Sequence, residues 1–339
     1  MGLTELREIL VRHEASFEEL RGRIAVDAFN TLYQFLSTIR GPSGGPLQDS
    51  TGRVTSHLSG LFYRTTSFLE KGLQPIFVFD GEPSPLKNRV LAERGARKAE
   101  AEEAMRKALK EGDFAAARSL AQRTAHLTDE MIEESKTLLS LLGVPTVQAP
   151  GEGEAQCAFM AAQGVVRFAA SQDFDALLFG APRLVRNLAI SGRRKLPHRQ
   201  IYVDVLPEII DLNESLAALG ISREKLVWIA LLCGTDFNEG VRGIGPKKGL
   251  KLVKENDSFD AVLAVAKAEM DWKPVFNEFV KPRVAHVKEN ELRFNEPDRD
   301  GIVKFLLARD FSRERVDAAL KRAFREPFGT KQEGLSAWV

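Results

Sequence analysis

Seven carboxylates stand at or near the ends of short apolar runs, and they constrain the fold of this chain more than any other feature. Asp27 and Asp80 each follow directly on such a run, and Asp173 comes shortly after a third. Buried strands of a parallel sheet deliver acids in this way, to the edge where their carboxyl ends meet. The pattern therefore predicts an α/β fold with its acids at that edge. The remaining four acids are Glu152, Glu154, Asp175 and Asp236.

Seven acids in one place would repel one another, since two like charges about 4 Å apart cost on the order of 4 kcal/mol at an effective dielectric constant near 20. Bound cations remove this repulsion. The set offers only oxygen ligands, which favours hard ions such as Mg²⁺ or Mn²⁺ over zinc or copper. Two such ions about 3.5 to 4 Å apart form a site for in-line phosphoryl transfer, in which one activates water and the other stabilises the leaving oxygen.

Each acid taken alone has a simpler interpretation, because Asp after a strand is also a common turn residue or helix N-cap. Glu152 and Glu154 are two residues apart, however, and so are Asp173 and Asp175. In extended backbone this spacing points both carboxylates of a pair to the same side. The combination favours a metal site without selecting one reaction.

The chain has 339 residues, of which 44% are hydrophobic, enough for a sizeable core in one large or two ordinary domains. No apolar run approaches the roughly 20 residues of a membrane span, and the N-terminus lacks a signal-peptide core, so we expect a cytoplasmic protein without a membrane partner.

Cys157 and Cys233 lie in apolar surroundings, which indicates buried thiols rather than a disulfide. No His forms a convincing triad with Ser and an acid, so covalent nucleophilic catalysis has no support.

The net charge is only +1, which does not by itself indicate nucleic-acid binding. Cations nevertheless cluster at 193–195, at 247–248 and between 87 and 110. Each cluster taken alone is most simply a solvated surface.

The order of predicted elements is that of an α/β domain with an insertion. Strands are expected at 23–27 and 74–80, with helices at 28–39 and 56–70 between them. The same sheet is expected to continue with strands at 145–148, 167–171, 184–188 and 200–205, separated by helices such as 130–142 and 154–163. The intervening helices, at 85–110 and about 113–125, are too polar to be well buried. Helices dominate after Ser222.

Gly243 and Gly245 form a tight turn ahead of a helix that begins with Pro246, Lys247 and Lys248. Gly-x-Gly before a helix is weak evidence, since an ordinary helix end followed by a turn has the same pattern. Here the turn combines free backbone N–H groups, a helix N-terminus and two ammonium groups, which suits a phosphate backbone. We therefore favour sequence-independent duplex binding over a purely structural turn.

The chain resembles the flap endonucleases, structure-specific 5′ nucleases of replication and repair, along essentially its whole length. In the N-terminal region the resemblance rests on DAFN at 27–30, YQFL at 33–36 and TSHLSGLFYR at 55–64. In the internal region it rests on VFDG at 78–81, GEGEAQ at 151–156, SQDFD at 171–175, GTD at 234–236 and GIGPKK at 243–248. The chain lacks the basic C-terminal extension of eukaryotic members and looks like the archaeal form.

The resemblance implies that the seven acids bind two Mg²⁺ ions, with Mn²⁺ as a substitute, and that a K⁺ ion assists at the glycine turn. It assigns residues 81–128 to a helical arch that passes the single-stranded 5′ flap. Lys87 and Arg94 match the basic residues that act on the scissile phosphate. Tyr33 matches an aromatic residue that stacks on a base. Further DNA contacts are implied at Arg40, Arg64, Glu152, Gly234, Asp236, Gly243, Gly245, Lys247 and Lys248.

The last nine residues resemble a sliding-clamp-binding peptide of the kind that binds proliferating cell nuclear antigen. Its anchors are Gln332, Leu335, Trp338 and Val339, the last standing where the family usually has an aromatic residue.

The implied domain plan is an N-terminal nuclease region 1–98, the arch 81–128, an internal nuclease region 116–258 with a helix-turn-helix element at about 222–258, C-terminal helices 259–330 and the tail 331–339. The fold class is a mixed, largely parallel central sheet flanked by helices.

Together these observations predict a magnesium-dependent 5′ flap endonuclease, with 5′ exonuclease activity, that acts as a monomer on branched DNA near the junction of single strand and duplex. An acid-cluster ribonuclease or phosphatase is the alternative enzyme, but it would not need the glycine turn or the polar insertion. A clamp-bound DNA scaffold without activity is the alternative non-enzyme, but it would not need all seven acids.

Overall fold

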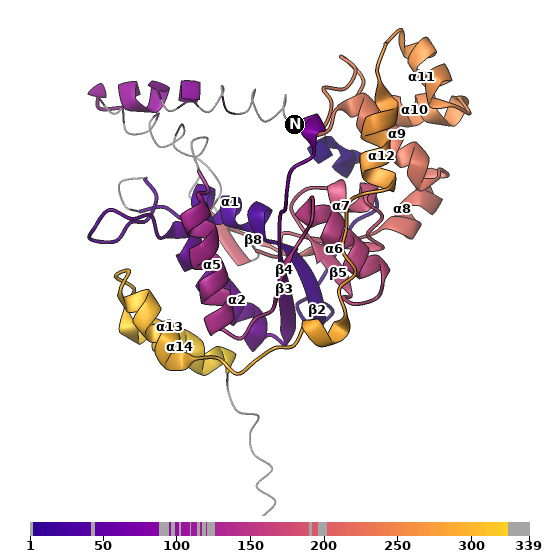
Figure 1. Ribbon diagram of the computed structural model, residues 1–339. Coiled ribbons are helices and arrows are strands. Elements are labelled where there is room, and N and C mark those ends of the chain that lie inside the picture. The colour runs from indigo at the N-terminus through magenta and orange to yellow at the C-terminus, as the bar shows by residue number, and fades with distance from the viewer. Residues whose placement is uncertain are drawn as a thin grey trace, which may run out of the picture.

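The computed structural model describes residues 3–41, 45–87, 95, 99–101, 103–108, 110–113, 116, 120, 126–189, 192–195 and 202–324. A central sheet of seven strands has the order β1-β9-β6-β5-β2-β3-β4 (Figure 1). Its strands are β1 (His13–Glu14), β2 (Gly22–Asp27), β3 (Leu73–Phe79), β4 (Thr146–Gln148), β5 (Phe168–Ala170), β6 (Arg183–Arg186) and β9 (Glu208–Asp211). Neighbours from β6 to β4 are parallel, whereas β9 is antiparallel to both β6 and β1. The predicted mixed, largely parallel sheet is confirmed.

The central strands are buried on both faces, and each face belongs to its own apolar cluster. On β2, Ile24 and Val26 join one cluster and Ala25 joins the other, as the two-residue period of a strand requires. The first cluster includes side chains of α1 (Ala28–Thr38), α2 (Ser56–Glu70), α5 (Asp129–Leu141), α13 (Arg299–Leu307) and α14 (Arg313–Ala323). The helices therefore form layers on both sides of the sheet (Figure 1).

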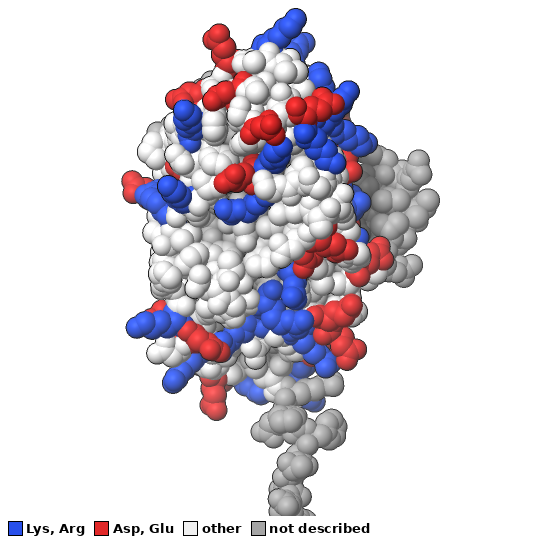
Figure 2. Space-filling model, turned by 90° about the vertical axis from the view of Figure 1, so that its right-hand side faces the viewer, with Lys and Arg blue, Asp and Glu red and all other residues white. Residues whose placement is uncertain are grey.

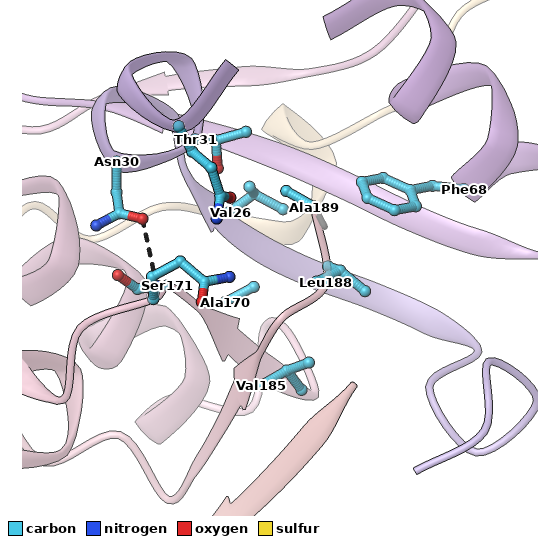
Figure 3. Close-up of a pocket in the computed structure, with 11 residues that line it drawn as sticks. Val26, Asn30, Thr31, Phe68, Ala170, Ser171, Val185, Leu188 and Ala189 are labelled. Atoms are coloured by element: carbon cyan, nitrogen blue, oxygen red, sulfur yellow. Dashed lines mark hydrogen bonds between the residues drawn. The ribbon is translucent and has the colours of Figure 1, made fainter. Parts of the chain in front are cut away.

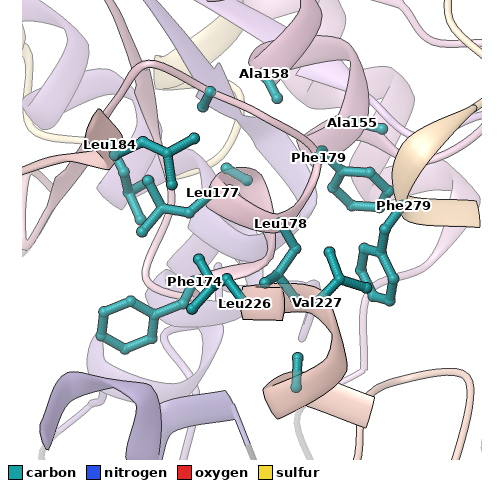
Figure 4. Close-up of a cluster of buried hydrophobic side chains, with 14 of the residues drawn as sticks. Ala155, Ala158, Phe174, Leu177, Leu178, Phe179, Leu184, Leu226, Val227 and Phe279 are labelled. Carbon is teal, nitrogen blue, oxygen red and sulfur yellow. The ribbon is translucent and has the colours of Figure 1, made fainter. Parts of the chain in front are cut away.

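The second cluster includes side chains of α6 (Gly153–Ala162), α7 (Asp175–Leu178), α8 (Leu212–Leu219), α9 (Arg223–Cys233), α10 (Pro246–Glu255), α11 (Phe259–Ala266) and α12 (Trp272–Val280). Figure 4 shows part of it, where Leu177 and Leu178 of α7 lie close to Leu226 and Val227 of α9. Phe174, fully buried, lies in the same cluster directly ahead of α7. The segment 173–175, which carries the acids Asp173 and Asp175, is thus anchored in the core.

The prediction that residues 200–205 belong to the central sheet is wrong. That strand, β8 (Tyr202–Val205), pairs with β7 (Gly192–Lys195) in a separate antiparallel hairpin. β9, three residues further on, takes the place beside β6. A short run of strand-forming residues fits an isolated hairpin as well as a sheet edge, so its composition could not decide between them.

The N-terminal segment 3–14 reaches elements from much later in the chain. It contains η1 (Leu3–Glu8), a 3₁₀ helix that packs against α9 and α10, and β1. Arg7 and Arg12 donate to Glu208 Oε1 at 2.8 and 3.2 Å, across 201 and 196 residues of sequence. The segment therefore closes the antiparallel edge of the sheet.

The remaining short elements are η2 (Pro85–Lys87) and η3 (Glu289–Glu291). Within the predicted helix 85–110 the structure describes the 3₁₀ turn 85–87 and helical residues at 99–101 and 103–108, whereas most of the predicted helix at about 113–125 lies outside the described residues. Among the helices that are described, none combines the length and the apolar character needed to cross a membrane.

Candidate active site

The acids meet at the carboxyl edge of the parallel strands, as the sequence predicts. Asp27 is the last residue of β2 and Asp80 directly follows β3. Asp173 follows β5 after two intervening residues, and Asp236 follows α9 in the same way. The charges of their neighbours raise the pKa values of Asp27, Asp80, Glu154 and Asp175, and these neighbours include the other three acids, so the fold brings the whole predicted set together.

The extended-backbone explanation for the closely spaced pairs is wrong. Glu152 is the N-cap of α6 and Glu154 lies in its first turn. Asp175 is the first residue of α7, after a bend at Asp173. Helix N-termini carry partial positive charge and free N–H groups, which stabilise nearby carboxylates. Two helix starts, rather than two strands, therefore aim these acids at the site.

Gly153 allows α6 to begin directly against Asp80. Its backbone N–H donates to Asp80 Oδ1 at 2.7 Å. A Cβ atom at this position would lie only 2.5 Å from the same oxygen. A larger residue would therefore displace either Asp80 or the start of the helix.

Burial and mutual repulsion raise the pKa values of the innermost acids. Burial, followed by the charge of Asp80, raises the pKa of Asp27 well above its usual range. Burial and the charge of Glu152 raise the pKa of Asp80 to about 6. Burial and neighbouring carboxylates likewise raise the pKa values of Glu154 and Asp175 well above normal. The site therefore favours the arrival of positive charge.

Lys87, the last residue of η2, already brings one positive charge to these acids. Its Nζ donates to Glu152 Oε2 and lies 3.7 Å from Asp236 Oδ2. Burial tends to lower the pKa of Lys87, but the charges of Glu152, Asp236 and Asp80 outweigh burial and raise it. The ammonium group therefore stays charged at neutral pH.

The donor set fits hard cations. It consists of carboxylate oxygens, and Asp175 Oδ1 is buried without a hydrogen-bond partner. As the side chains lie, no three described His, Cys, Asp or Glu residues are close enough together to hold one ion. Carboxylates that repel one another favour this wide separation of their oxygen atoms. A bound divalent cation would offset the repulsion.

Two residues that the sequence analysis did not single out bind the acids. Ser171 Oγ donates to Glu154 Oε1 and accepts the N–H of Asp173 at 3.2 Å. Asn30, in the first turn of α1, donates from its amide Nδ2 to Asp173 Oδ2 at 2.8 Å. Both lie inside motifs that carry the family resemblance, which was the available signal for their importance.

The residues predicted to contact DNA lie on several different elements. Tyr33 on α1 is 42% exposed. Arg40 follows α1 and its Nε donates to Ser37 O at 3.1 Å. Burial lowers the pKa of Arg64 on α2. Outside the described residues lie Arg94, Gln332, Leu335, Trp338 and Val339.

The glycine turn lies between α9 and α10, which pack against each other. Gly234 ends α9 at φ 96°, Gly243 has φ 79°, and Gly245 is the N-cap of α10. Lys247 pairs with Glu8 at 3.0 Å, and its side chain is 74% exposed. Both lysines of the turn stand in the first helical turn of α10, which contains no acid.

Comparison with known proteins decides the family. The XPG N-terminal domain matches residues 1–101, and the XPG I-region matches residues 143–236. Flap endonuclease 1 of Thermococcus onnurineus is 48% identical over 342 residues, which cover 100% of this chain and 99% of the relative. The chain belongs to the flap endonuclease family. Flap endonuclease 1 of Pyrococcus furiosus is 49% identical over 335 residues, covering 98% and 97% of the two chains.

Solved structures agree with this membership. The flap endonuclease-1 of Methanococcus jannaschii matches with a TM-score of 0.74 and 40% identity, over 95% of this chain and 98% of the other. The catalytic core of Rad2 in complex with DNA substrate matches with a TM-score of 0.68 over 96% and 100% of the chains, but at 24% identity it supports the fold alone. The predicted archaeal resemblance is confirmed. This flap endonuclease is a structure-specific nuclease, a hydrolase of phosphodiester bonds with a role in DNA replication and repair.

Proposed function

We propose that this flap endonuclease cuts DNA by two-metal hydrolysis at the carboxyl edge of its sheet. The observation that carries the proposal is the group of buried acids with raised pKa values beside Lys87. When bound, two Mg²⁺ ions would lower the pKa of the attacking water and stabilise the leaving oxygen, and Mn²⁺ would substitute with the same oxygen ligands. The proposed ligands are Asp27, Asp80, Glu152, Glu154, Asp173, Asp175 and Asp236.

Lys87 is proposed to move its ammonium group from Glu152 to the scissile phosphate. Its Nζ already lies among the acids, and its raised pKa keeps it cationic. There it would stabilise the charge that develops on the phosphate in the transition state, together with Arg94. Because Lys87 lies near the start of the segment assigned to the arch, arrival of the flap and placement of this cation would occur together.

The glycine turn is proposed to bind the phosphates of the duplex. A K⁺ ion bound at the turn is proposed to assist this contact. Lys247 and Lys248 lie beside the positive end of the α10 dipole, an unfavourable arrangement that an anion would relieve. Figure 2 shows a face on which basic and acidic side chains are mixed, which favours local phosphate contacts over one broad basic field.

Branched DNA with a 5′ flap is the proposed substrate. Among relatives of this fold, the Rad2 core is seen with DNA substrate and human GEN1 with Holliday junction DNA. Tyr33 would stack on a base beside the cut, and Arg40, Arg64 and Gly234 would contact the strands near it. The tail 331–339 would recruit a monomer of the enzyme to a sliding clamp on DNA in the cytoplasm, close to the nucleoid.

A cleavage assay tests the proposed reaction. Matched substrates with a 5′ flap, a 3′ flap, plain duplex and single-stranded RNA are incubated with and without Mg²⁺. We expect cutting of the 5′ flap near its junction, only with the metal. Preference for RNA would favour the ribonuclease alternative, and cutting that persists in a chelator would contradict the metal mechanism.

A further inference from the structure

Asn30 contacts the acid site from two sides. Its backbone N–H donates to Asp27 Oδ1 at 3.0 Å, and its side-chain Nδ2 donates to Asp173 Oδ2 at 2.8 Å. Its side-chain Oδ1 accepts the N–H of Gln172 at 3.3 Å, the bond drawn as a dashed line in Figure 3. One residue of α1 thus links the end of β2 to the loop after β5, across 143 residues of sequence.

The side-chain contacts require an amide. The backbone bond to Asp27 is an ordinary N-cap interaction that any residue except proline would make. The other two bonds need a donor and an acceptor on the same short side chain, which Asn provides and Ala lacks. Substitution of Asn30 therefore removes the link to Asp173 and leaves the cap of Asp27 in place.

The loop is bound from its other side as well. Arg186 Nε donates to the carbonyl of Gln172 at 2.9 Å, and its guanidinium lies 4.2 Å from the centre of the Phe174 ring. Both backbone polar groups of Gln172 are thus bound by side chains, one by Asn30 and one by Arg186. The residue that precedes Asp173 has little freedom to turn.

Hydrogen bonds as well as packing orient the Asn30 amide. It borders a cavity of about 10 Å³, room for roughly one water molecule, that Gln34 and Ser171 also line (Figure 3). The Gln34 Oε1 atom is buried without a hydrogen-bond partner among the described groups. Because the bonds to Asp173 and Gln172 use both polar atoms of the amide, they decide its orientation beside this cavity.

We propose that Asn30 is a positioning residue of the nuclease site, which fixes Asp173 relative to Asp27 so that both can bind the same pair of cations. The inference rests on the proposed acid site. Removal of a group that orients a metal ligand commonly lowers metal affinity or activity by 10- to 100-fold. We therefore expect Asn30→Ala to weaken Mn²⁺ binding by about 10-fold.

The experiment measures Mn²⁺ binding without DNA, by isothermal titration calorimetry, for wild type, Asn30→Ala, Asp173→Asn and the double variant. Thr38→Ala is the control on the same helix, since among the described residues its hydroxyl bonds only the backbone carbonyl of Gln34 within α1. We expect Asn30→Ala to bind Mn²⁺ more weakly, to lower kcat and to leave KM for a flap substrate unchanged. Once Asp173→Asn is present, Asn30→Ala should cause little further loss, because the two groups act as one unit.

The outcomes separate this inference from the proposed site. Unchanged Mn²⁺ binding in Asn30→Ala, with a clear loss in Asp173→Asn, would overturn the role of Asn30 alone. Unchanged binding in both variants would overturn the acid site itself. Additive losses in the double variant, accompanied by a lower Tm, would show general structural damage and also overturn the inference. Asn30→Ser, which keeps a small polar group, provides a second variant should Asn30→Ala fold poorly.

Discussion

Gly60 of α2 lies directly against the ring of Phe35 of α1, so that a Cβ atom at position 60 would come within 2.1 Å of Phe35 Cγ. The two helices that border the nuclease edge therefore pack at a distance that glycine permits. Gly60→Ala should lower the free energy of unfolding by about 2 kcal/mol, because overpacking outweighs the better helix propensity of alanine. Urea denaturation measures the change. Phe35→Leu should recover part of the loss in the double variant, and independent effects would contradict the contact.

Replacing a buried acid should separate chemistry from docking. Asp175→Ala or Asp80→Ala should reduce flap cutting to background while binding to the junction remains measurable, because metal ligands act mainly on the transition state. Single-turnover cleavage and fluorescence anisotropy give the two quantities. Asp317→Ala, at an exposed carboxylate of α14 that pairs only with Arg313 among the described residues, is a suitable control. A wild-type rate in either acid variant at saturating substrate would show that these acids are not the active site.

The raised pKa of Asp80 predicts how pH acts on the metal-free protein. A pKa of about 6 in the folded state, against 3.8 for the ordinary group, means that the folded protein binds more protons between these values. The contribution of Asp80 to the free energy of unfolding is therefore fully present below about pH 4, and it is lost as the pH rises through about 6. Between pH 4.5 and 7.5 in a chelator, wild type should lose ~2 kcal/mol more than Asp80→Asn. Urea titrations at both pH values measure this difference, in which groups that do not interact with Asp80, such as His57, cancel.

Added Mg²⁺ provides the counterpart of that experiment. It should raise the Tm of wild type more at pH 7.5 than at pH 4.5, because ionised carboxylates bind the cation. An equal rise at both pH values would contradict the assignment of the ions to these acids.

The lysines of the glycine turn should control affinity without controlling sequence preference. Lys247→Ala with Lys248→Ala should weaken binding to any duplex and flatten the slope of log K against log salt by about one unit for each phosphate that the protein no longer neutralises. Anisotropy across a salt series measures the slope. Lys251→Ala, further along α10, serves as the matched charge control. An unchanged slope would count against phosphate binding at the turn.

Deleting residues 331–339 should separate recruitment from catalysis. We expect the truncated enzyme to cut an oligonucleotide flap at close to the wild-type rate without a clamp, yet to lose most of the stimulation by a clamp on DNA, since a tethered peptide acts by raising local concentration. Trp338→Ala should cause much of the same loss, because an aromatic anchor can contribute about 2 kcal/mol. Equal slowing with and without clamp would place the tail in the folded enzyme.

The sequence predicted the elements that carry continuous apolar patterns. β2, β3, α1 and α2 lie within one residue of their predicted bounds, because each is a long apolar or periodic run with clear ends. β1 and β9 were missed, since strands of two and four residues at a sheet edge leave little pattern to detect.

The site shows a similar division. The meeting of the acids could be predicted because parallel strands align their carboxyl ends, and this holds for Asp27 and Asp80. The helix predicted from Glu154 is confirmed as α6, whereas the short helix that begins at Asp175 could not be separated from extended backbone by spacing alone. For Asn30 the only signal was its place in the family motif at 27–30, because its contact with Asp173 depends on how distant segments pack rather than on any periodicity.

The bonds from Arg7 and Arg12 to Glu208 have a consequence for synthesis of the chain. The N-terminal segment leaves the ribosome first, but its partners on β9, α9 and α10 are made some 200 residues later. At roughly 5 to 20 residues per second, that interval is about 10 to 40 s. Until then the edge of the sheet stays open, and Asp236 has not joined the acids. The nascent chain is therefore expected to have no nuclease activity until most of the enzyme has been made, so that cutting begins only once α9 and α10, which we propose bind the duplex, are present.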